Sequence, residues 1–188
     1  MSVVLDRRPG FTLLEILTVL AIMAILGGLV FAATSGMLDK SKRDTASAEM
    51  DIIEQALESY KARFGDYPVD TGTYSGTPAN AEQFLFNALM GKISPSGGPI
   101  NVKPMLNYAP LKLANGNYPD PGNSSSVSNW IVDPWGNAYR YQFDPDSSSW
   151  TQFGYLLYSA GPDGLYSASS SGENNPSASN NEDNIYAR

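Results

Sequence analysis

The N-terminal part of the chain carries a long apolar run with one carboxylate inside it. Apolar and small residues continue almost unbroken from Phe11 to Ala33, about 23 residues, which as a helix is long enough to cross the hydrocarbon core of a bilayer. Glu15 lies within this run, and a carboxylate near the middle of a bilayer costs roughly 2.5–3.5 kcal/mol. The glutamate therefore needs either a partner charge or a path along which its side chain reaches the headgroups.

Three interpretations of residues 1–36 are open on this basis. A secretory signal would use Arg7-Arg8 as its basic region and be cleaved after Val30–Ala32, but the run is longer than the usual stretch of about 7–15 residues. A twin-arginine export signal would also use Arg7-Arg8, although Pro9–Phe11 matches that pattern poorly. The third interpretation is a retained transmembrane helix. Lys and Arg are similarly frequent on both flanks, so their distribution does not fix an orientation.

A helical pattern continues beyond the apolar run. Small and apolar residues recur at spacings of three and four, which predicts one face of an amphipathic helix, at Leu38, Ser41, Thr45, Ala48, Ile52, Ala56, Tyr60 and Phe64, with Ile53 and Leu57 widening the stripe. Gly65 supplies the stop. A helix from Phe11 to Phe64 would be about 80 Å long at 1.5 Å per residue. Its first half is apolar all round and suits lipid, and its second half suits packing against a small domain.

The rest of the chain predicts a small α+β domain. Thr77 is expected to cap a second helix over Ala79–Met90 that Gly91 ends, and residues 92–128 are expected to form a long connecting loop because they are rich in Pro, Gly, Ser and Asn. Strand patterns follow at Trp130–Val132, Ala138–Phe143 and Gln152–Ser159, with a turn at Asp133–Asn137. Two or three antiparallel strands on the helical stripe complete the α+β domain.

Composition excludes several classes of function. The chain contains no histidine and no cysteine, which removes Ser-His and Cys-His catalysis, the commonest zinc ligands and disulfides. The net charge is −7 with a pI near 4.5, and phosphate binding requires clustered Lys and Arg. We therefore expect no nucleic-acid partner. A carboxylate pair such as Asp163 and Asp183 could still serve acid–base chemistry, but the pair lies in a loop that suits a bound ion better, so we expect no enzyme activity.

The segment Gly10-Phe11-Thr12-Leu13-Leu14-Glu15 resembles the processing site of type IV prepilins and pseudopilins. The resemblance implies that residues 1–10 are a leader, that a prepilin peptidase cuts between Gly10 and Phe11, and that the new amine on Phe11 is methylated. Pro9 departs from the commoner basic or small residue before the glycine. In a helical filament, Glu15 of one subunit can meet the Phe11 amine of another, which makes each buried charge tolerable.

Two further segments resemble the major pseudopilins of type II secretion systems: the helix exit at Tyr60–Pro68 and the Asp133–Gly136 turn. The resemblance implies a pilin fold, in which a long N-terminal helix packs on a small antiparallel sheet with an acidic C-terminal loop. Residues 11–36 would form the transmembrane and filament-core half of the helix, 37–64 its amphipathic half, and 65–188 a periplasmic globular domain. The implied function is a subunit of a pseudopilus that polymerises from the inner membrane to drive export across the outer membrane. Its implied partners are copies of itself, other pseudopilins and an inner-membrane assembly platform.

The same resemblance implies a calcium-binding loop over residues 159–188. Calcium takes six to eight oxygen ligands without strict geometry, and the expected ligands are Asp163, Asp183, Glu182, Asn184 and the carbonyl of Ala160. The chain departs from the family pattern in the longer segment Leu165–Asn180 and in Asn184, where a carboxylate is expected. The alternative is a hairpin turn at Asp163-Gly164 followed by a solvated polar tail.

Two other functions remain as alternatives. A type IV pilin for adhesion or motility would share the N-terminal segment, although many such pilins close their C-terminal loop with a disulfide, which a chain without cysteine cannot form. An exported calcium-dependent binding module, for sugars among other ligands, would use the N-terminus only as a signal and yield a soluble product that begins near Ala33.

Overall fold

The computed structural model describes residues 11–69, 80–146, 154–166 and 179–187, and for residues 30–36 it describes the backbone alone. The chain divides into two compact units, Met1–Ser41 and Lys42–Arg188. The predicted leader and the predicted helix cap Thr77 lie outside the described residues. All the packing described below belongs to the second unit.

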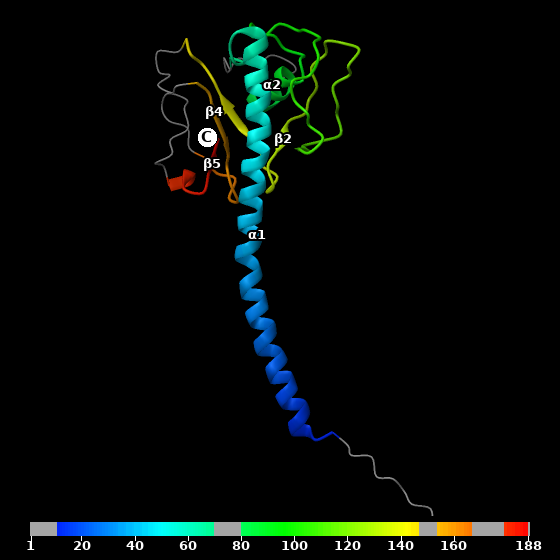
Figure 1. Cartoon of the computed structure of the whole chain (residues 1–188), viewed down its shortest axis with the longest axis vertical. Coiled ribbons are helices and arrows are strands. Elements are labelled where there is room, and N and C mark those ends of the chain that lie inside the picture. Colours follow the sequence, from blue (N-terminus) through cyan, green and yellow to red (C-terminus); the bar gives the residue numbers. More distant parts are fainter. Residues whose placement is uncertain (1–10, 70–79, 147–153, 167–178, 188) are drawn as a thin grey trace, which may run out of the picture. The chain divides into compact units, whose positions relative to one another are not determined.

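Helix α1 spans Leu13–Phe64, so the predicted long helix is confirmed (Figure 1). It ends at Gly65, whose φ of 94° is costly for a residue with a side chain and whose amide donates to the carbonyl of Lys61 at 2.7 Å. Among the residues described, no helix has the combination of length and apolar character that crossing a membrane requires.

The buried face of α1 in the second unit differs from the predicted stripe. Its buried residues follow one another at intervals of three and four along the helix: Ala46, Met50, Ile53, Leu57 and Tyr60, with Ala56 beside them. Thr45 and Ala48 are exposed, so the first half of the predicted stripe was wrong. Small residues mark a helix face weakly, whereas Met50, Ile53 and Leu57 carry most of the apolar area that packing can bury.

Helix α2 spans Ala81–Leu89, and its N-cap is Asn80, whose side chain accepts a hydrogen bond from the amide of Gln83 at 3.0 Å. The described helix thus begins later than the predicted start at Ala79. At its C-terminal end Gly91 has a φ of 70°, and a Cβ there would lie 2.5 Å from the carbonyl oxygen of Val102. The glycine lets the following chain pass close against the helix end.

Among the described residues, the strands form two antiparallel sheets. Strand β1 (Lys112–Leu113) pairs with β2 (Ile131–Val132), while β3 (Arg140–Gln142), β4 (Leu156–Ser159) and β5 (Ile185–Tyr186) form a sheet of order β3-β4-β5. A 3₁₀ helix, η1, covers Ser179–Asn181. Strands β2, β3 and β4 confirm the three predicted strands within the described residues, and the predicted start at residues 152–153 lies outside those residues. Strand β1 lies inside the predicted loop 92–128 and β5 inside the predicted acidic tail, so both were missed.

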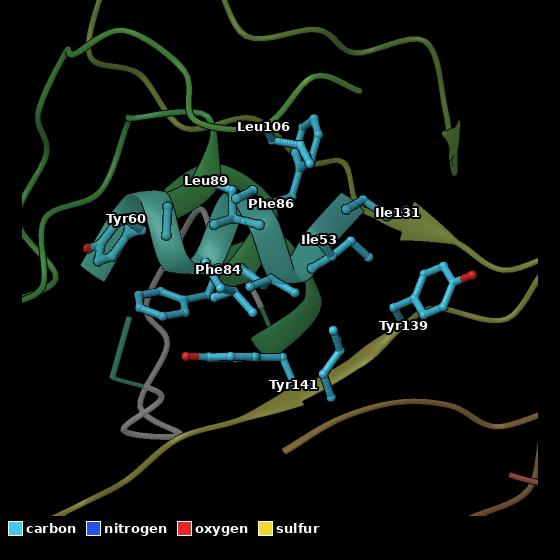
Figure 2. Close-up of a cluster of buried hydrophobic side chains, with 14 of the residues drawn as sticks. Ile53, Tyr60, Phe84, Phe86, Leu89, Leu106, Ile131, Tyr139 and Tyr141 are labelled. Carbon is cyan, nitrogen blue, oxygen red and sulfur yellow. The ribbon is translucent and has the colours of Figure 1, made fainter. Parts of the chain in front are cut away.

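The core of the second unit joins the buried face of α1 to α2 and the sheets (Figure 2). Tyr60, Tyr139 and Tyr141 are each at most 1% exposed, and each hydroxyl has a hydrogen-bond partner: the carbonyl of Ile93, the carboxylate of Glu49 and the carbonyl of Pro68 respectively. Buried phenols stabilise a core when their polar ends are satisfied in this way. Three tyrosines therefore fix the positions of segments that are distant in sequence.

The contact between Tyr139 and Glu49 links the residue just before β3 to α1. The hydroxyl donates to Oε2 of Glu49 at 2.6 Å. Burial raises the pKa of Glu49, by more than the hydrogen bond from Tyr139 lowers it, and the charge of Asp133 raises it further. A folded-state pKa above the unfolded value means that this carboxyl contributes stability at low pH, and that the contribution is lost as pH rises through the folded pKa.

We therefore expect Glu49→Gln to gain stability relative to the natural chain as pH rises. The glutamine oxygen can still accept from Tyr139, while the cost of burying a charge disappears. Urea unfolding of the full chain in detergent between about pH 4 and pH 7 measures this difference in free energy. Asp51→Asn, at an exposed position of the same helix, is the control. A stability difference for Glu49→Gln that stays constant with pH would contradict the assignment.

Candidate functional site

The N-terminal candidate segment begins at the first turn of α1. Gly10 lies outside the described residues, and Phe11 is 80% exposed. Thr12 caps the helix: its side-chain oxygen accepts from the amide of Glu15 at 3.2 Å, and its carbonyl oxygen accepts from the same amide at 3.1 Å. A threonine cap with glutamate three positions later is the capping-box pattern. The structure shows the threonine half of this pattern, the cap by Thr12, which sequence reasoning missed although the residues T-L-L-E display it.

Around this helix start, the apolar side chains are uncovered. Those of the first described residues are 46–82% exposed: Phe11, Leu13, Leu14, Ile16, Leu17, Val19, Leu20, Ile22, Met23, Ile25, Leu26 and Leu29. Such a surface is far larger than the apolar patches that monomeric soluble proteins normally expose. Covering such a surface with an apolar environment is favourable.

A second candidate site is built on the turn between β2 and β3. Asp133 is fully buried, and its Oδ1 accepts from the amides of Trp135 (3.0 Å) and Asn137 (2.8 Å). Its Oδ2 accepts from the hydroxyl of Ser159 at 2.6 Å. A buried carboxylate is stable when each oxygen is paired in this manner. Asp133 therefore fixes the turn and attaches it to the end of β4.

The C-terminal loop is held against this turn. The side-chain amide of Asn137 donates to the carbonyl of Gly161 at 2.9 Å, and the amide of Gly161 donates to the Ser159 hydroxyl at 3.1 Å. Gly161 has a φ of 67°, and a Cβ there would lie 2.7 Å from the carbonyl oxygen of Asp183 and 2.8 Å from its Oδ2. The missing side chain thus makes room for Asp183 beside the end of β4.

The structure brings together some of the predicted calcium ligands. The Asp163 amide lies 3.5 Å from Oδ2 of Asp183, and Oδ1 of Asp163 accepts from the amide of Leu165 at 2.8 Å. Ala160 is buried, and Glu182 is exposed. Asn184 donates to Oδ1 of Asn181 at 3.2 Å, while its own Oδ1 is buried and has no hydrogen-bond partner in the described structure.

These groups fit a hard cation in the chemistry of their donors. Two carboxylates, a buried amide oxygen without a partner and nearby carbonyls are the oxygen ligands that calcium takes. Within the described ranges, no group of three or more His, Cys, Asp or Glu side chains is placed to hold a metal. Any ion here would accordingly depend on amide and carbonyl oxygens as well as on Asp163 and Asp183.

Two basic side chains lie against the C-terminal loop. Arg43 of α1 donates to the carbonyl of Asp183 at 3.2 Å. Arg140 of β3 forms an ion pair with the buried Glu82 of α2, and its guanidinium lies 4.3 Å from the ring centre of Tyr166. The loop is thus in contact with α1 and β3. Sequence reasoning placed Asp133 and Asn137 in a turn but missed their contacts with Ser159 and Gly161. It missed both arginines as well, because these partners are distant in sequence.

The long helix on small antiparallel sheets and the capped N-terminal segment define a pilin-like protein. Residues 5–31 match the family model described as the prokaryotic N-terminal methylation motif. The chain is 31% identical over 160 residues to the type II secretion system core protein G of Pectobacterium carotovorum, covering 85% of this chain and 79% of the relative. It is 30% identical to the core protein G of Aeromonas hydrophila (84% and 85% covered) and of Pseudomonas aeruginosa (84% and 86% covered). The chain belongs to the family of type II secretion system core protein G, the major pseudopilins.

We expect Asp133→Ala to destabilise the full chain by about 3 kcal/mol, because it removes hydrogen bonds to a charged group and leaves buried donors unpaired. Denaturant unfolding in detergent measures the loss. Asp146→Ala removes an exposed carboxylate and should change the free energy of unfolding by no more than about 0.5 kcal/mol. Equal effects of the two substitutions would show that Asp133 does not hold the turn.

Proposed function

We propose that the chain is the structural subunit of a type II secretion pseudopilus. It would be anchored in the bacterial inner membrane with residues 65–188 in the periplasm, and it would polymerise to drive protein export across the outer membrane. The observation that carries the proposal is the similarity to core protein G, which extends over 84–85% of the chain and is joined to an N-terminal methylation motif. The role is structural and not enzymatic.

Assembly follows from the chemistry of the N-terminus. Prepilin peptidase would cut between Gly10 and Phe11, which leaves a cationic amine one residue before the helix cap at Thr12. Glu15 lies within the first turn, so its charge is close to that amine along the chain. In a helical filament, the glutamate of one subunit would pair with the amine of another inside an apolar core, where either charge alone is costly.

The exposed apolar side chains of residues 11–29 support the membrane and filament roles. Covering an apolar surface of this extent with lipid or with other copies of the chain lowers the free energy. The inner membrane would hold the segment before assembly, and the α1 segments of neighbouring subunits would replace lipid afterwards. Other pseudopilins and an inner-membrane assembly platform would complete the set of partners.

The test is the pair of variants Glu15→Gln and Glu15→Ala. Glutamine also suits the third position of a capping box but carries no charge. If charge pairing drives assembly, both variants should be processed to a chain that begins at Phe11, as intact mass would show, and both should form few or no filaments by electron microscopy. Gly10→Val should remain unprocessed and serves as the control for cleavage. Normal filaments from Glu15→Gln would show that charge pairing does not drive assembly.

We also propose that the C-terminal loop binds one calcium ion. Asp163 and Asp183 would supply charge, Asn184 an amide oxygen and Ala160 a carbonyl, with Glu182 as a further ligand. Two observations support this assignment: within the described residues the buried Oδ1 of Asn184 has no hydrogen-bond partner, and the missing side chain at Gly161 lets Asp183 approach the end of β4. The ion would supply a positive charge that neutralises the carboxylates and closes a loop that has no disulfide.

Calcium should raise the melting temperature of the full chain in detergent relative to the chain in chelator. At a free concentration about a hundred times the Kd, the gain is about 2.7 kcal/mol, or roughly 5–10 °C for a chain of this size. Asp183→Asn should lose this shift, and Asp146→Asn, which changes an exposed carboxylate, should keep it. The absence of any calorimetric binding at millimolar calcium, together with no effect of chelator, would exclude the site.

A further inference from the structure

Lys92 is a charged residue in the core that no proposed function uses. It follows Gly91 at the end of α2 and is 2% exposed. Its ammonium donates to Oδ1 of Asn101 at 2.8 Å, to the carbonyl of Asp120 at 2.7 Å and to the carbonyl of Asn123 at 2.6 Å. All three acceptors belong to the segment 92–128, which was predicted as a long connecting loop.

The number of acceptor oxygens around Lys92 equals the number of N–H donors on its ammonium group. A lysine ammonium has three N–H donors and no acceptor, and here three oxygens surround it. Burying such a charge is unfavourable unless every donor is satisfied. The chain therefore gains from holding residues 101, 120 and 123 together, because separating them would leave a buried charge without partners.

The acceptors are themselves positioned by local hydrogen bonds. The carboxylate of Asp120 accepts from the amide of Gly122 at 2.7 Å and from the side chain of Asn123 at 2.8 Å. The side-chain amide of Asn101 donates to the carbonyl of Pro121 at 3.1 Å. The turn at 120–123 thus presents two carbonyls to Lys92, and Asn101 contacts both the lysine and this turn.

The backbone of Lys92 is fixed as firmly as its side chain. Its amide donates to the carbonyl of Asn87 in α2 at 2.9 Å, and its carbonyl accepts from the amide of Ile100 at 2.9 Å. The amide of Val102 donates to the carbonyl of Gly91 at 3.0 Å. The ammonium is therefore anchored to the end of α2, and the segment folds back onto that anchor.

We propose that Lys92 is an internal cation on which the segment 92–128 folds. The ammonium gathers carbonyl and amide oxygens, as a bound metal ion does in loops of similar composition, but it is covalently part of the chain. The segment consequently keeps its conformation without any bound ion. This inference does not depend on the proposed function, and it distinguishes the segment from the C-terminal loop, for which we propose an exchangeable ion.

The first experiment compares hydrogen exchange of the full chain in detergent for Lys92→Met and Lys103→Met. Lys103 is an exposed lysine in the same segment and provides the matched control. We expect the amides of Ile100, Val102 and Gly122 to exchange at least about tenfold faster in Lys92→Met, because hydrogen bonds to a charged group are lost. The control should exchange as the natural chain does. Equal exchange in the two variants would overturn the proposal.

A second measurement uses the natural chain, in case Lys92→Met fails to fold. Brief acetylation of the folded protein, followed by peptide mass spectrometry, should modify the exposed Lys103 and Lys112 at least about tenfold faster than Lys92, because an ammonium held by three hydrogen bonds reacts only after local opening. Modification of Lys92 at the rate of Lys103 would overturn the proposal.

Discussion

The C-terminal half of the second unit depends on the hydrogen bonds that the buried carboxylate of Asp133 accepts. It lies where β2 leaves its sheet, and its three hydrogen bonds close the turn into β3 while binding the end of β4 through Ser159. Asn137, at the end of the same turn, donates to the carbonyl of Gly161 in the C-terminal loop, and Gly161 in turn lies against Asp183. A charge without pairing would be costly at such a position. These hydrogen bonds therefore connect the turn after β2, the end of β4 and the C-terminal loop.

A chain without cysteine has to close its long loops with polar groups. Three devices appear in the described residues of the second unit. Buried tyrosine hydroxyls link α1 to the chain beyond it, the carboxylate of Asp133 fixes a turn, and the ammonium of Lys92 gathers the segment 92–128. Each places a strong donor or acceptor where water is excluded, which makes its hydrogen bonds strong and their loss expensive. These hydrogen bonds also favour one conformation of each loop over others, because an incorrect partner would leave the same buried group unsatisfied.

Local patterns of the sequence predicted what depends on local chemistry. The long apolar and amphipathic helix, its stop at Gly65 and the turn after Val132 were all legible from the residues themselves. The incorrect predictions concern the buried face of α1 and the shortest strands, which tertiary contacts determine. The small residues Thr45 and Ala48 carried too little information to fix the helix face, and β1 and β5 have only two residues each. In strands this short, pairing with β2 and β4 matters more than any alternating pattern.

The candidate sites also divide into those that local sequence could predict and those that depend on distant contacts. The helix cap by Thr12 involves an amide only three positions further along the chain, so it was available from sequence and was overlooked. Lys92 was not available, because its acceptors lie 9 to 31 positions further along the chain. A lysine just after a helix-ending glycine is ordinarily a solvated charge. Only the fold shows that Gly91 allows the chain at Val102 to approach closely, and that this approach encloses the ammonium. The same glycine that ends the helix therefore also creates the condition under which a lysine becomes a structural cation.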